Sequence, residues 1–423
     1  MKVSVIGLGY VGLPLACAIA RETNHTVVGY DKSTRKINSI KNGICPIDDE
    51  QCEKDLKEVK FEISDTPEII ENSDVYIVCV PTPVLNDYTP DLTPVKNATE
   101  DIANYLKKGQ VVVIESTINP GVCDEIVVPI LEDKTGMKAG IDFDVAHCPE
   151  RINPGDPYWN VYNIPRNIGS TRLETTKKIA EFYRSFINAE INEMPNLKTA
   201  EATKIIENTF RDINIAFVNE LARSFEVLGI DLLAVIKGAS NKPFAFMPHF
   251  PSCGVGGHCI PVDPYYLIER AKQSGFDHKF LKLAREINNS MPEYTIDKLT
   301  EALNIFEKSV KNTKVGLLGL SYKANVGDIR ESPSLKLKDI LIEKHADLLI
   351  FDPYFPEMSN TESLEEILQK SYAIVLATDH KVFKQLTAEK LLEYDIKIVI
   401  DGKNCLNKQE IQDVGIYYKG IGT

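Results

Sequence analysis

The chain has 423 residues, of which 43% are hydrophobic and 26% are charged, so it holds enough apolar material for two or three packed domains. Its formal net charge of −13 at pH 7 excludes a general nucleic-acid-binding protein, because phosphate backbones are held mainly by clustered Lys and Arg, but it leaves room for a local basic pocket. The nine cysteines are scattered along the chain, which favours reduced thiols in a cytoplasmic protein over a disulfide scaffold.

The N-terminal segment has two interpretations. Val3 to Ala20 carries no charge and ends in Ala-Ile-Ala, as a secretion signal would. Three glycines and Pro14 nevertheless make it a poor continuous helix. Val3 to Ile6 instead predicts a buried strand, followed by a glycine turn and a helix over Leu13 to Arg21. We find no other segment long enough to span a membrane, so we expect none to do so.

The glycine turn has the spacing of a dinucleotide-binding fingerprint. Its sequence, Gly7-Leu8-Gly9-Tyr10-Val11-Gly12, lies between the predicted strand and helix. A second strand, Thr26 to Tyr30, places Asp31 about 20 residues after the last glycine, where such sites hold the adenosine ribose. We expect the turn to bind the pyrophosphate of NAD. An acid at the ribose repels a 2′-phosphate, which favours NAD over NADP although Lys32 and Arg35 lie close in sequence.

Further apolar runs continue an alternating β/α pattern. Strands are predicted over Val75 to Pro81 and Gln110 to Thr117, and again, after about residue 310, over Lys314 to Leu320, Ala346 to Asp352, Tyr372 to Asp379 and Lys397 to Gly402. The second series keeps only Gly316 and Gly319, so it predicts a nucleotide-handling domain that does not hold a dinucleotide pyrophosphate.

Between these series, Leu197 to Gly229 predicts one long helix without an internal Gly or Pro. The predicted fold is therefore α/β, with two Rossmann-like parallel-sheet domains joined by a helical domain. We place the domains at residues 1–195, 196–300 and 301–423. A helix of this length commonly links domains or packs against a partner subunit.

The stretch CGVGGHCIPVDPYYL, from Cys253 to Leu267, contains the sharpest candidate for chemistry. Cys259 follows three glycines that would let the backbone approach a ligand closely, and it precedes Asp263. A zinc site with His249, Cys253 and His258 is the weaker alternative, because adjacent His and Cys do not match the usual paired ligand spacing. Pairing of Cys259 with His258 as in a cysteine hydrolase is weaker still, since neighbouring side chains in an extended loop point apart. We expect no metal.

Two further sets of polar residues are candidates. Lys204, Asn208 and Arg211 share one face of the long helix, which by residue spacing alone is more often a solvated face than a catalytic one. Thr117 and Glu150 follow apolar strands, where open α/β sheets place ligand contacts, although Thr and Glu are also ordinary turn residues.

Several long motifs, in order along nearly the whole chain, resemble the UDP-glucose/GDP-mannose dehydrogenase family. They are GLGYVGLPLA from Gly7, VPTP from Val80, ESTINPG from Glu115, PERINPGD from Pro149, the Lys204 and Asn208 helix leading to Asn219 and Glu220, GVGGHCIPVDPYYL, and YKANVGDIRESPS from Tyr322. The resemblance implies an NAD-dependent, four-electron oxidation of the C6 alcohol of a nucleotide sugar to a carboxylate.

The resemblance also implies residue roles. Cys259 would hold the substrate as a thiohemiacetal and then a thioester. Lys204 and Asn208 would stabilise oxyanionic charge, Asp263 and Thr117 would position water and protons, and Glu150 would assist hydrolysis. Cofactor contacts fall on Gly7, Gly9, Tyr10, Val11, Gly12, Asp31, Arg35, Thr82 and Thr117. Substrate contacts fall on Glu150, Arg151, Lys204, Asn208, Arg211, Gly256, Tyr322, Lys323 and Arg330, the last three facing UDP.

One departure from the family pattern shifts the expected substrate. Members that oxidise UDP-glucose carry Lys before the loop aspartate, whereas Val262 precedes Asp263 here. The motifs are similar to the branch that oxidises UDP-N-acetylglucosamine or UDP-N-acetylmannosamine for polysaccharide or glycan synthesis. UDP-glucose 6-dehydrogenase is the runner-up. An inactive nucleotide-sugar-binding protein and a two-electron dehydrogenase that releases aldehyde also stay open, because a fold does not guarantee a function. We expect a homodimer or a higher homo-oligomer.

Overall fold

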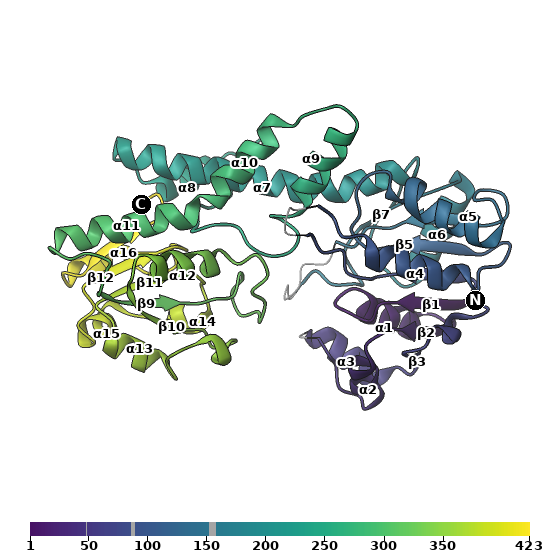
Figure 1. The fold of residues 1–423 in the computed structure, drawn as a ribbon, viewed down its shortest axis with the longest axis horizontal. Coiled ribbons are helices and arrows are strands. Elements are labelled where there is room, and N and C mark those ends of the chain that lie inside the picture. The colour runs from purple at the N-terminus through teal and green to yellow at the C-terminus, as the bar shows by residue number, and fades with distance from the viewer. Residues whose placement is uncertain (48, 86–88, 152–157) are drawn as a thin grey trace. The chain divides into compact units, whose positions relative to one another are not determined.

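The computed structural model describes residues 1–47, 49–85, 89–151 and 158–423 (Figure 1). The chain divides into two units by its internal contacts. One unit contains residues 1–207 and 265–276, and the other contains residues 208–264 and 277–423. The boundary falls within the helix α7 (Leu197–Leu228), so this one helix contributes residues to both units.

The first unit is built on an eight-stranded sheet with the strand order β3-β2-β1-β4-β5-β6-β7-β8. Its strands are β1 (Lys2–Ile6), β2 (Thr26–Tyr30), β3 (Glu62–Ser64), β4 (Val75–Val78), β5 (Val111–Ile114), β6 (Asp144–His147), β7 (Arg166–Ser170) and β8 (Ile191–Glu193). Neighbouring strands pair in parallel except β6 and β7, which are antiparallel. The predicted parallel sheet is therefore confirmed, with one reversal that the sequence pattern did not indicate.

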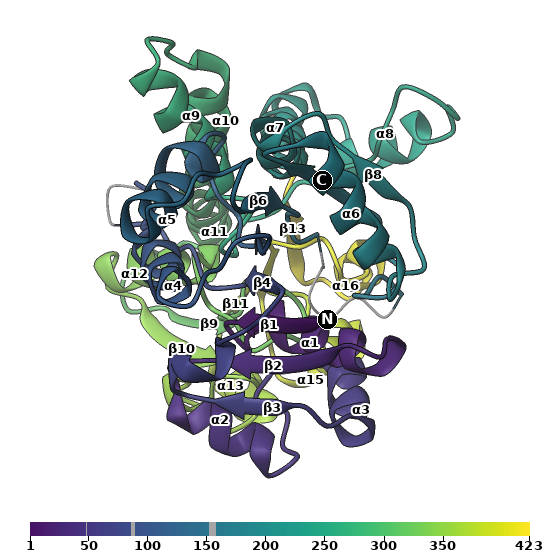
Figure 2. The same ribbon diagram turned by 90° about the vertical axis from the view of Figure 1, so that its right-hand side faces the viewer.

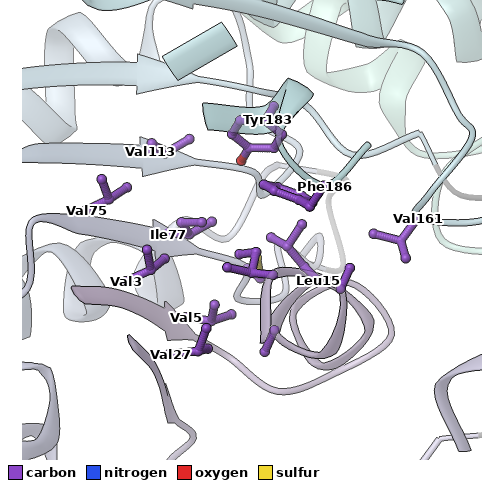
Figure 3. Packing of buried hydrophobic residues seen from close by; sticks show 14 of the residues in the cluster. Val3, Val5, Leu15, Val27, Val75, Ile77, Val113, Val161, Tyr183 and Phe186 are labelled. Carbon is purple, nitrogen blue, oxygen red and sulfur yellow. The ribbon is translucent and has the colours of Figure 1, made fainter. Parts of the chain in front are cut away.

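Helices cover both faces of this sheet (Figure 2). They are α1 (Gly12–Glu22), α2 (Thr34–Lys41), α3 (Glu50–Glu58), η1 (Pro67–Ile70), α4 (Thr93–Ala103), η2 (Cys123–Val127), α5 (Val128–Thr135) and α6 (Leu173–Arg184). One apolar cluster joins the sheet to α1, α3 and α6, and another joins it to α4 and α5. Figure 3 shows Val5 and Ile77 of the sheet beside Leu15 of α1. Each such buried aliphatic side chain contributes about 1.5–3 kcal/mol.

The second unit holds a five-stranded parallel sheet with the order β10-β9-β11-β12-β13. Its strands are β9 (Lys314–Leu318), β10 (Asp347–Phe351), β11 (Ala373–Leu376), β12 (Ile398–Asp401) and β13 (Tyr417–Gly420). The remaining helices are α8 (Leu232–Ala239), α9 (Asp263–Gln273), α10 (Lys279–Asn289), α11 (Met291–Ile305), α12 (Pro333–Glu343), η3 (Pro356–Met358), α13 (Leu364–Lys370), α14 (Lys381–Lys384), α15 (Ala388–Glu393) and α16 (Lys408–Asp413). α11 and α12 pack on one face of the sheet, and α13 to α16 pack on the other.

The predicted fold class is confirmed: two Rossmann-like parallel-sheet domains and a helical segment that includes one long helix. The expected division at residues 195 and 300 stays a prediction. Among the described residues, no helix combines the length and the apolarity needed to cross a bilayer.

Candidate active site

The glycine turn after β1 fits a bound dinucleotide. Gly7 has φ +93°, and a Cβ there would lie 2.7 Å from the carbonyl oxygen of Cys79. A Cβ on Gly12 would lie 1.9 Å from the Gly7 oxygen, so only glycine allows α1 to start this close to the turn. At Gly9, by contrast, no atom lies within 4 Å of an added Cβ. The turn thus leaves open space at the glycine that lets a phosphate approach the backbone.

Asp31 follows β2 and is held in place by the turn. It accepts hydrogen bonds from the backbone N–H of Leu8 and of Ser33, both at 2.9 Å, and from Lys36 Nζ at 3.0 Å. Lys36, at the start of α2, pairs with Asp31, whereas the sequence pattern had drawn attention only to Lys32 and Arg35. Lys32 Nζ lies 3.2 Å from the Asp101 carboxylate. The side chains of Arg35 and Tyr10 are exposed, and that of Val11 is half-buried.

Replacing Asp31 with Asn is expected to raise the KM for NAD about 10-fold or more, because a charged hydrogen-bond acceptor for the ribose hydroxyls is lost. Steady-state kinetics at saturating sugar nucleotide measures this change. Asp65→Asn is the control, since Asp65 accepts a surface hydrogen bond from Thr34 at 2.7 Å. An unchanged KM in the Asp31 variant would contradict the assignment.

The loops after β4 and β5 are fastened by α9. Tyr266 is 1% exposed, and its hydroxyl donates to the carbonyl oxygen of Thr82 at 2.6 Å. Its own carbonyl oxygen accepts from the side-chain amide of Asn119 at 3.3 Å. Thr117, two residues before Asn119, is half-buried. Sequence reasoning missed Tyr266, although it lies within the quoted loop motif.

Lys204 is buried in α7, with 8% of its surface exposed. One helical turn before it, Glu201 accepts from the backbone N–H groups of Gly121 and Cys123, which fixes α7 against the turn that follows Thr117. Lys204 is therefore held on a rigid element beside that turn. The solvated-face interpretation fits Arg211, which is exposed, but not Lys204.

Glu150 follows β6, and burial raises the pKa of its carboxyl to about 7, against the lowering effects of Lys204 and Arg166. A carboxyl with this pKa can take or release a proton near neutral pH. The next residue, Arg151, pairs with Glu207 of α7 at 2.6 Å and donates to the Pro165 oxygen at 3.0 Å. The predicted substrate contact at Arg151 therefore involves a cation that already has an acidic neighbour.

In the second unit, Cys259 opens a tight turn into α9. Its carbonyl oxygen accepts from the N–H groups of Val262 at 3.1 Å and Asp263 at 2.8 Å. Asp263 is 2% exposed, and its carboxylate accepts from the side-chain amide of Asn208 at 2.6 Å. The structure thus brings together three of the predicted catalytic residues: Cys259, Asp263 and Asn208.

The glycines before Cys259 pack closely against other residues of the protein. A Cβ on Gly254 would lie 2.6 Å from Pro333, one on Gly256 would lie 2.6 Å from Tyr322 Cβ, and one on Gly257 would lie 2.8 Å from the Tyr322 ring. The loop's close approach is therefore to Tyr322 and Pro333 of the protein itself. That these glycines also let a ligand approach the backbone stays a prediction.

Gly256→Ala is expected to destabilise the fold by about 1–3 kcal/mol and to reduce turnover, because the added methyl overlaps Tyr322 and the loop must shift. Thermal unfolding and steady-state rates measure both effects. The matched control is Gly238→Ala in α8, where an added Cβ meets no atom within 4 Å. Equal stability of the two variants would show that the loop does not depend on this packing.

Tyr322 and Arg330 come from the loop after β9. The Gly257 N–H donates to the Arg330 oxygen at 3.0 Å, which ties this loop to the cysteine loop. The Arg330 guanidinium forms a forked ion pair with Asp328, at 2.6 Å for Nη2, and its charge also interacts with Cys259. Asp328 was missed by sequence reasoning. Lys323 lies half-buried beside Tyr322.

Asp352, at the end of β10, repeats the position of Asp31 in the other sheet. It accepts from the Leu320 N–H at 2.6 Å and the Ser321 N–H at 2.9 Å, and His380 Nε2 lies 3.3 Å away. Burial raises its pKa, but these bonds together hold it well below the usual range. This acid is 1% exposed, against 9% for Asp31. That this domain does not bind a dinucleotide stays a prediction.

The four residues of the weaker zinc alternative do not converge on one another. Cys253 Sγ donates to the Ala377 oxygen at 3.5 Å, and His249 lies edge-on to Phe210 with ring centroids 6.1 Å apart. Within the described part of the chain, no group of three or more His, Cys, Asp or Glu side chains could hold a metal ion.

Comparison with known proteins assigns the family. Residues 1–187 match the NAD binding domain of the UDP-glucose/GDP-mannose dehydrogenase family, residues 198–290 match its central domain, and residues 316–408 match its UDP binding domain. The chain belongs to this family. It is an NAD-dependent UDP-sugar dehydrogenase, and the resemblance inferred from its motifs is confirmed.

Two of the relatives of this dehydrogenase are named for N-acetylated sugars. It is 37% identical to the UDP-N-acetyl-D-mannosamine dehydrogenase of Pyrococcus horikoshii over 100% of this chain and 99% of the relative. It is also 37% identical to the UDP-N-acetyl-D-glucosamine 6-dehydrogenase of Pseudomonas aeruginosa, over 95% and 97% of the two chains. The solved structure of the Pyrococcus horikoshii enzyme superposes with a TM-score of 0.93 at 36% identity, covering 100% and 99% of the chains.

Proposed function

We propose that this dehydrogenase oxidises the C6 alcohol of a UDP-N-acetylhexosamine, UDP-N-acetylglucosamine or UDP-N-acetylmannosamine, to the uronate for polysaccharide or glycan synthesis. The observation that carries the proposal is the turn at Cys259, whose Asp263 is bonded to Asn208. The likeness to enzymes of both sugars, at equal identity, supports the substrate class. UDP-N-acetylmannosamine is the first substrate to test, because that relative matches the whole chain.

The first oxidation converts the alcohol to the aldehyde. NAD held by the glycine turn and Asp31 would supply the acceptor for the hydride that leaves C6, and the proton of the C6 hydroxyl passes to the water that Asp263 and Thr117 position. Lys204 stabilises the alkoxide oxygen through its positive charge, and Asn208 donates a hydrogen bond to the same developing charge. Asp31 and the glycine turn hold the cofactor, with Thr82 on the nicotinamide side.

The thiol of Cys259 then retains the aldehyde. Sγ bonds to the carbonyl carbon and a proton goes to the oxygen, which gives a thiohemiacetal. The same carbon then loses a second hydride, for which a second NAD in the same cofactor site would be the acceptor, and the hydroxyl proton passes to water, which gives a thioester. Because the aldehyde stays covalently bound, it is not released between the two oxidations.

Hydrolysis completes the reaction. The oxygen of water bonds to the acyl carbon while Glu150 takes one of its protons, and the C–S bond breaks with its electron pair going to Sγ of Cys259. Asp263 and Thr117 position the water. The pKa of Glu150, raised by burial to about 7, suits a group that must accept a proton and return it at neutral pH.

The UDP-sugar is held by residues outside the reacting centre. Tyr322, Lys323 and Arg330 face the UDP moiety. The positive charges of Lys323 and Arg330 bind the negatively charged diphosphate. Gly256, Arg151 and Arg211 complete the predicted substrate contacts.

The substrate assignment is tested by incubating the purified protein with NAD and, separately, UDP-N-acetylmannosamine, UDP-N-acetylglucosamine and UDP-glucose. We expect the uronate, identified by mass spectrometry, from an N-acetylated sugar. Uronate from UDP-glucose alone would support the runner-up activity. Binding of the sugar nucleotide without any product would support the inactive binding protein.

We also propose that the protein forms a homodimer through α7. This helix exposes several large apolar side chains: Ile206, Phe210, Phe217, Val227 and Leu228. Sedimentation at micromolar concentration is expected to give a dimer or a higher oligomer, and a monomer there would contradict the proposal.

A further inference from the structure

A fully buried ion pair in the first unit has no part in the steps above. Arg166, the first residue of β7, and Glu115, the residue after β5, each have 0% side-chain exposure, and Nη1 lies 3.5 Å from Oε2. Nε and Nη2 of Arg166 are buried without a hydrogen-bond partner among the described residues. A buried charge that is only partly bonded costs stability, so it needs a reason other than folding.

Tyr183 of α6 fixes the acidic member of this pair. It is 0% exposed and lies beside Phe186 over the same sheet face as Val113 (Figure 3). Its hydroxyl donates to Oε1 of Glu115, on the carboxylate whose other oxygen faces Arg166. The carboxylate that faces the guanidinium is therefore fixed by a buried, packed tyrosine.

The pair is linked to Glu150 through the backbone. The Glu150 N–H donates to the Glu115 carbonyl oxygen at 3.3 Å, so the two backbones are bonded at the ends of β5 and β6. The charge of Arg166 interacts with the Glu150 carboxyl and, with Lys204, lowers its pKa against burial, whereas Glu115 raises it.

Two thiols also interact with the charge of Glu150. Cys79 follows β4 and Cys148 follows β6, and both interact with the Glu150 charge. Burial raises the pKa of both thiols well above the ordinary value, so they are neutral at pH 7. Two cations lower the pKa of Glu150 through their charge: Lys204, from α7, and Arg166, from β7.

We propose that Arg166 is a positioning residue for the hydrolysis step: its buried guanidinium, fixed by Glu115 and Tyr183, supports the carboxylate form of Glu150 that takes a proton from water. This inference rests on the proposed function for its catalytic consequence, but the electrostatic coupling exists in the protein without substrate. Lys204 faces the reacting oxygen and Glu150 alike, whereas Arg166 acts through Glu150.

The coupling is measured by carbon-13 NMR of the labelled glutamate carboxyls, with Glu150→Gln to assign the signal. Arg166→Met removes the cation, so the titration midpoint of Glu150 is expected to rise by about 0.5 pH unit or more. Glu115→Gln removes an anion, so the midpoint is expected to fall. Arg166→Lys keeps the charge and is expected to restore most of the wild-type value. Opposite shifts from two buried variants are not expected from a merely structural role.

Arg285→Met is the matched control, because Arg285 is also buried and paired with an acid, Asp212, in the other unit. It is expected to leave the Glu150 midpoint unchanged. Midpoints of Arg166→Met and Glu115→Gln within about 0.2 pH unit of wild type would overturn the inference. If Arg166→Met does not fold, the Glu115→Gln and Arg166→Lys titrations decide it.

The catalytic consequence is measured in single turnovers. Glu150 works as a base only above its pKa. In Arg166→Met, the acid limb of the pH profile of the hydrolysis rate is therefore expected to move to higher pH. The acyl-enzyme on Cys259 is then expected to accumulate at pH 7. Equal slowing of both oxidations and of hydrolysis, with the limb unmoved, would overturn the role in hydrolysis. Absence of uronate from the wild-type protein would instead count against the proposed function, while the NMR midpoints still decide the coupling.

Discussion

Cys259→Ser is expected to lower uronate formation at least about 10³-fold while NAD and the UDP-sugar still bind. A serine hydroxyl is a weaker nucleophile than a thiol, and an ester formed through it would have a poorer leaving group than a thioester. The turn itself should survive, because its hydrogen bonds are made by the backbone of Cys259, Val262 and Asp263.

The rate is measured as uronate by mass spectrometry, and binding is measured by calorimetry. Cys405→Ser is the control, since Cys405 is a half-buried thiol in the same unit and no role is assigned to it. Wild-type rates of uronate formation in the Cys259 variant would contradict covalent catalysis. Loss of binding as well as turnover would point to a distorted loop.

Lys204→Met is expected to slow both oxidations by about 10²- to 10³-fold, because a buried cation no longer stabilises the charge on the reacting oxygen. A second effect follows at Glu150. Lys204 lowers the pKa of that carboxyl, so its loss raises the pKa, and less of the Glu150 base form is present at pH 7. Hydrolysis should therefore also slow, and it should recover as the pH is raised.

Stopped-flow measurement of the NADH burst separates these two effects. Lys198→Met is the control on the same helix, since Lys198 lies on the surface 3.7 Å from Asp124. An unchanged burst rate in Lys204→Met would remove Lys204 from the oxidation steps. If the pH profile of hydrolysis did not shift in Lys204→Met, the proposed effect of Lys204 on the pKa of Glu150 would be contradicted.

The sequence predicted the regular parts of the fold well. β1, β2 and the long helix follow from continuous apolar runs and from the absence of helix breakers, and each lies within one or two residues of its predicted bounds. β3 and β8 have three residues each and include polar side chains, so they carry no apolar run. β7 is buried throughout, but it begins with the charged Arg166, so its sequence lacks the apolar run that would predict a buried strand.

In the candidate site, only residues that lie within the sequence motifs could be predicted. Cys259, Asp263 and Asn208 are close because α7 and the loop meet, but the residues that hold the site in place are individually ordinary. Tyr266 anchors the Thr82 loop from 184 residues away, and Glu201 anchors the turn at Gly121 from 80 residues away. Such partners follow from packing and carry no local sequence signal.

The covalent, four-electron reaction is tested most directly by counting NADH formed per molecule of sugar consumed, with limiting UDP-N-acetylhexosamine and excess NAD. We predict about two NADH per sugar with no free aldehyde trapped, because the thiol retains the intermediate through the second hydride transfer. About one NADH per sugar, with aldehyde recovered in the trap, would contradict it.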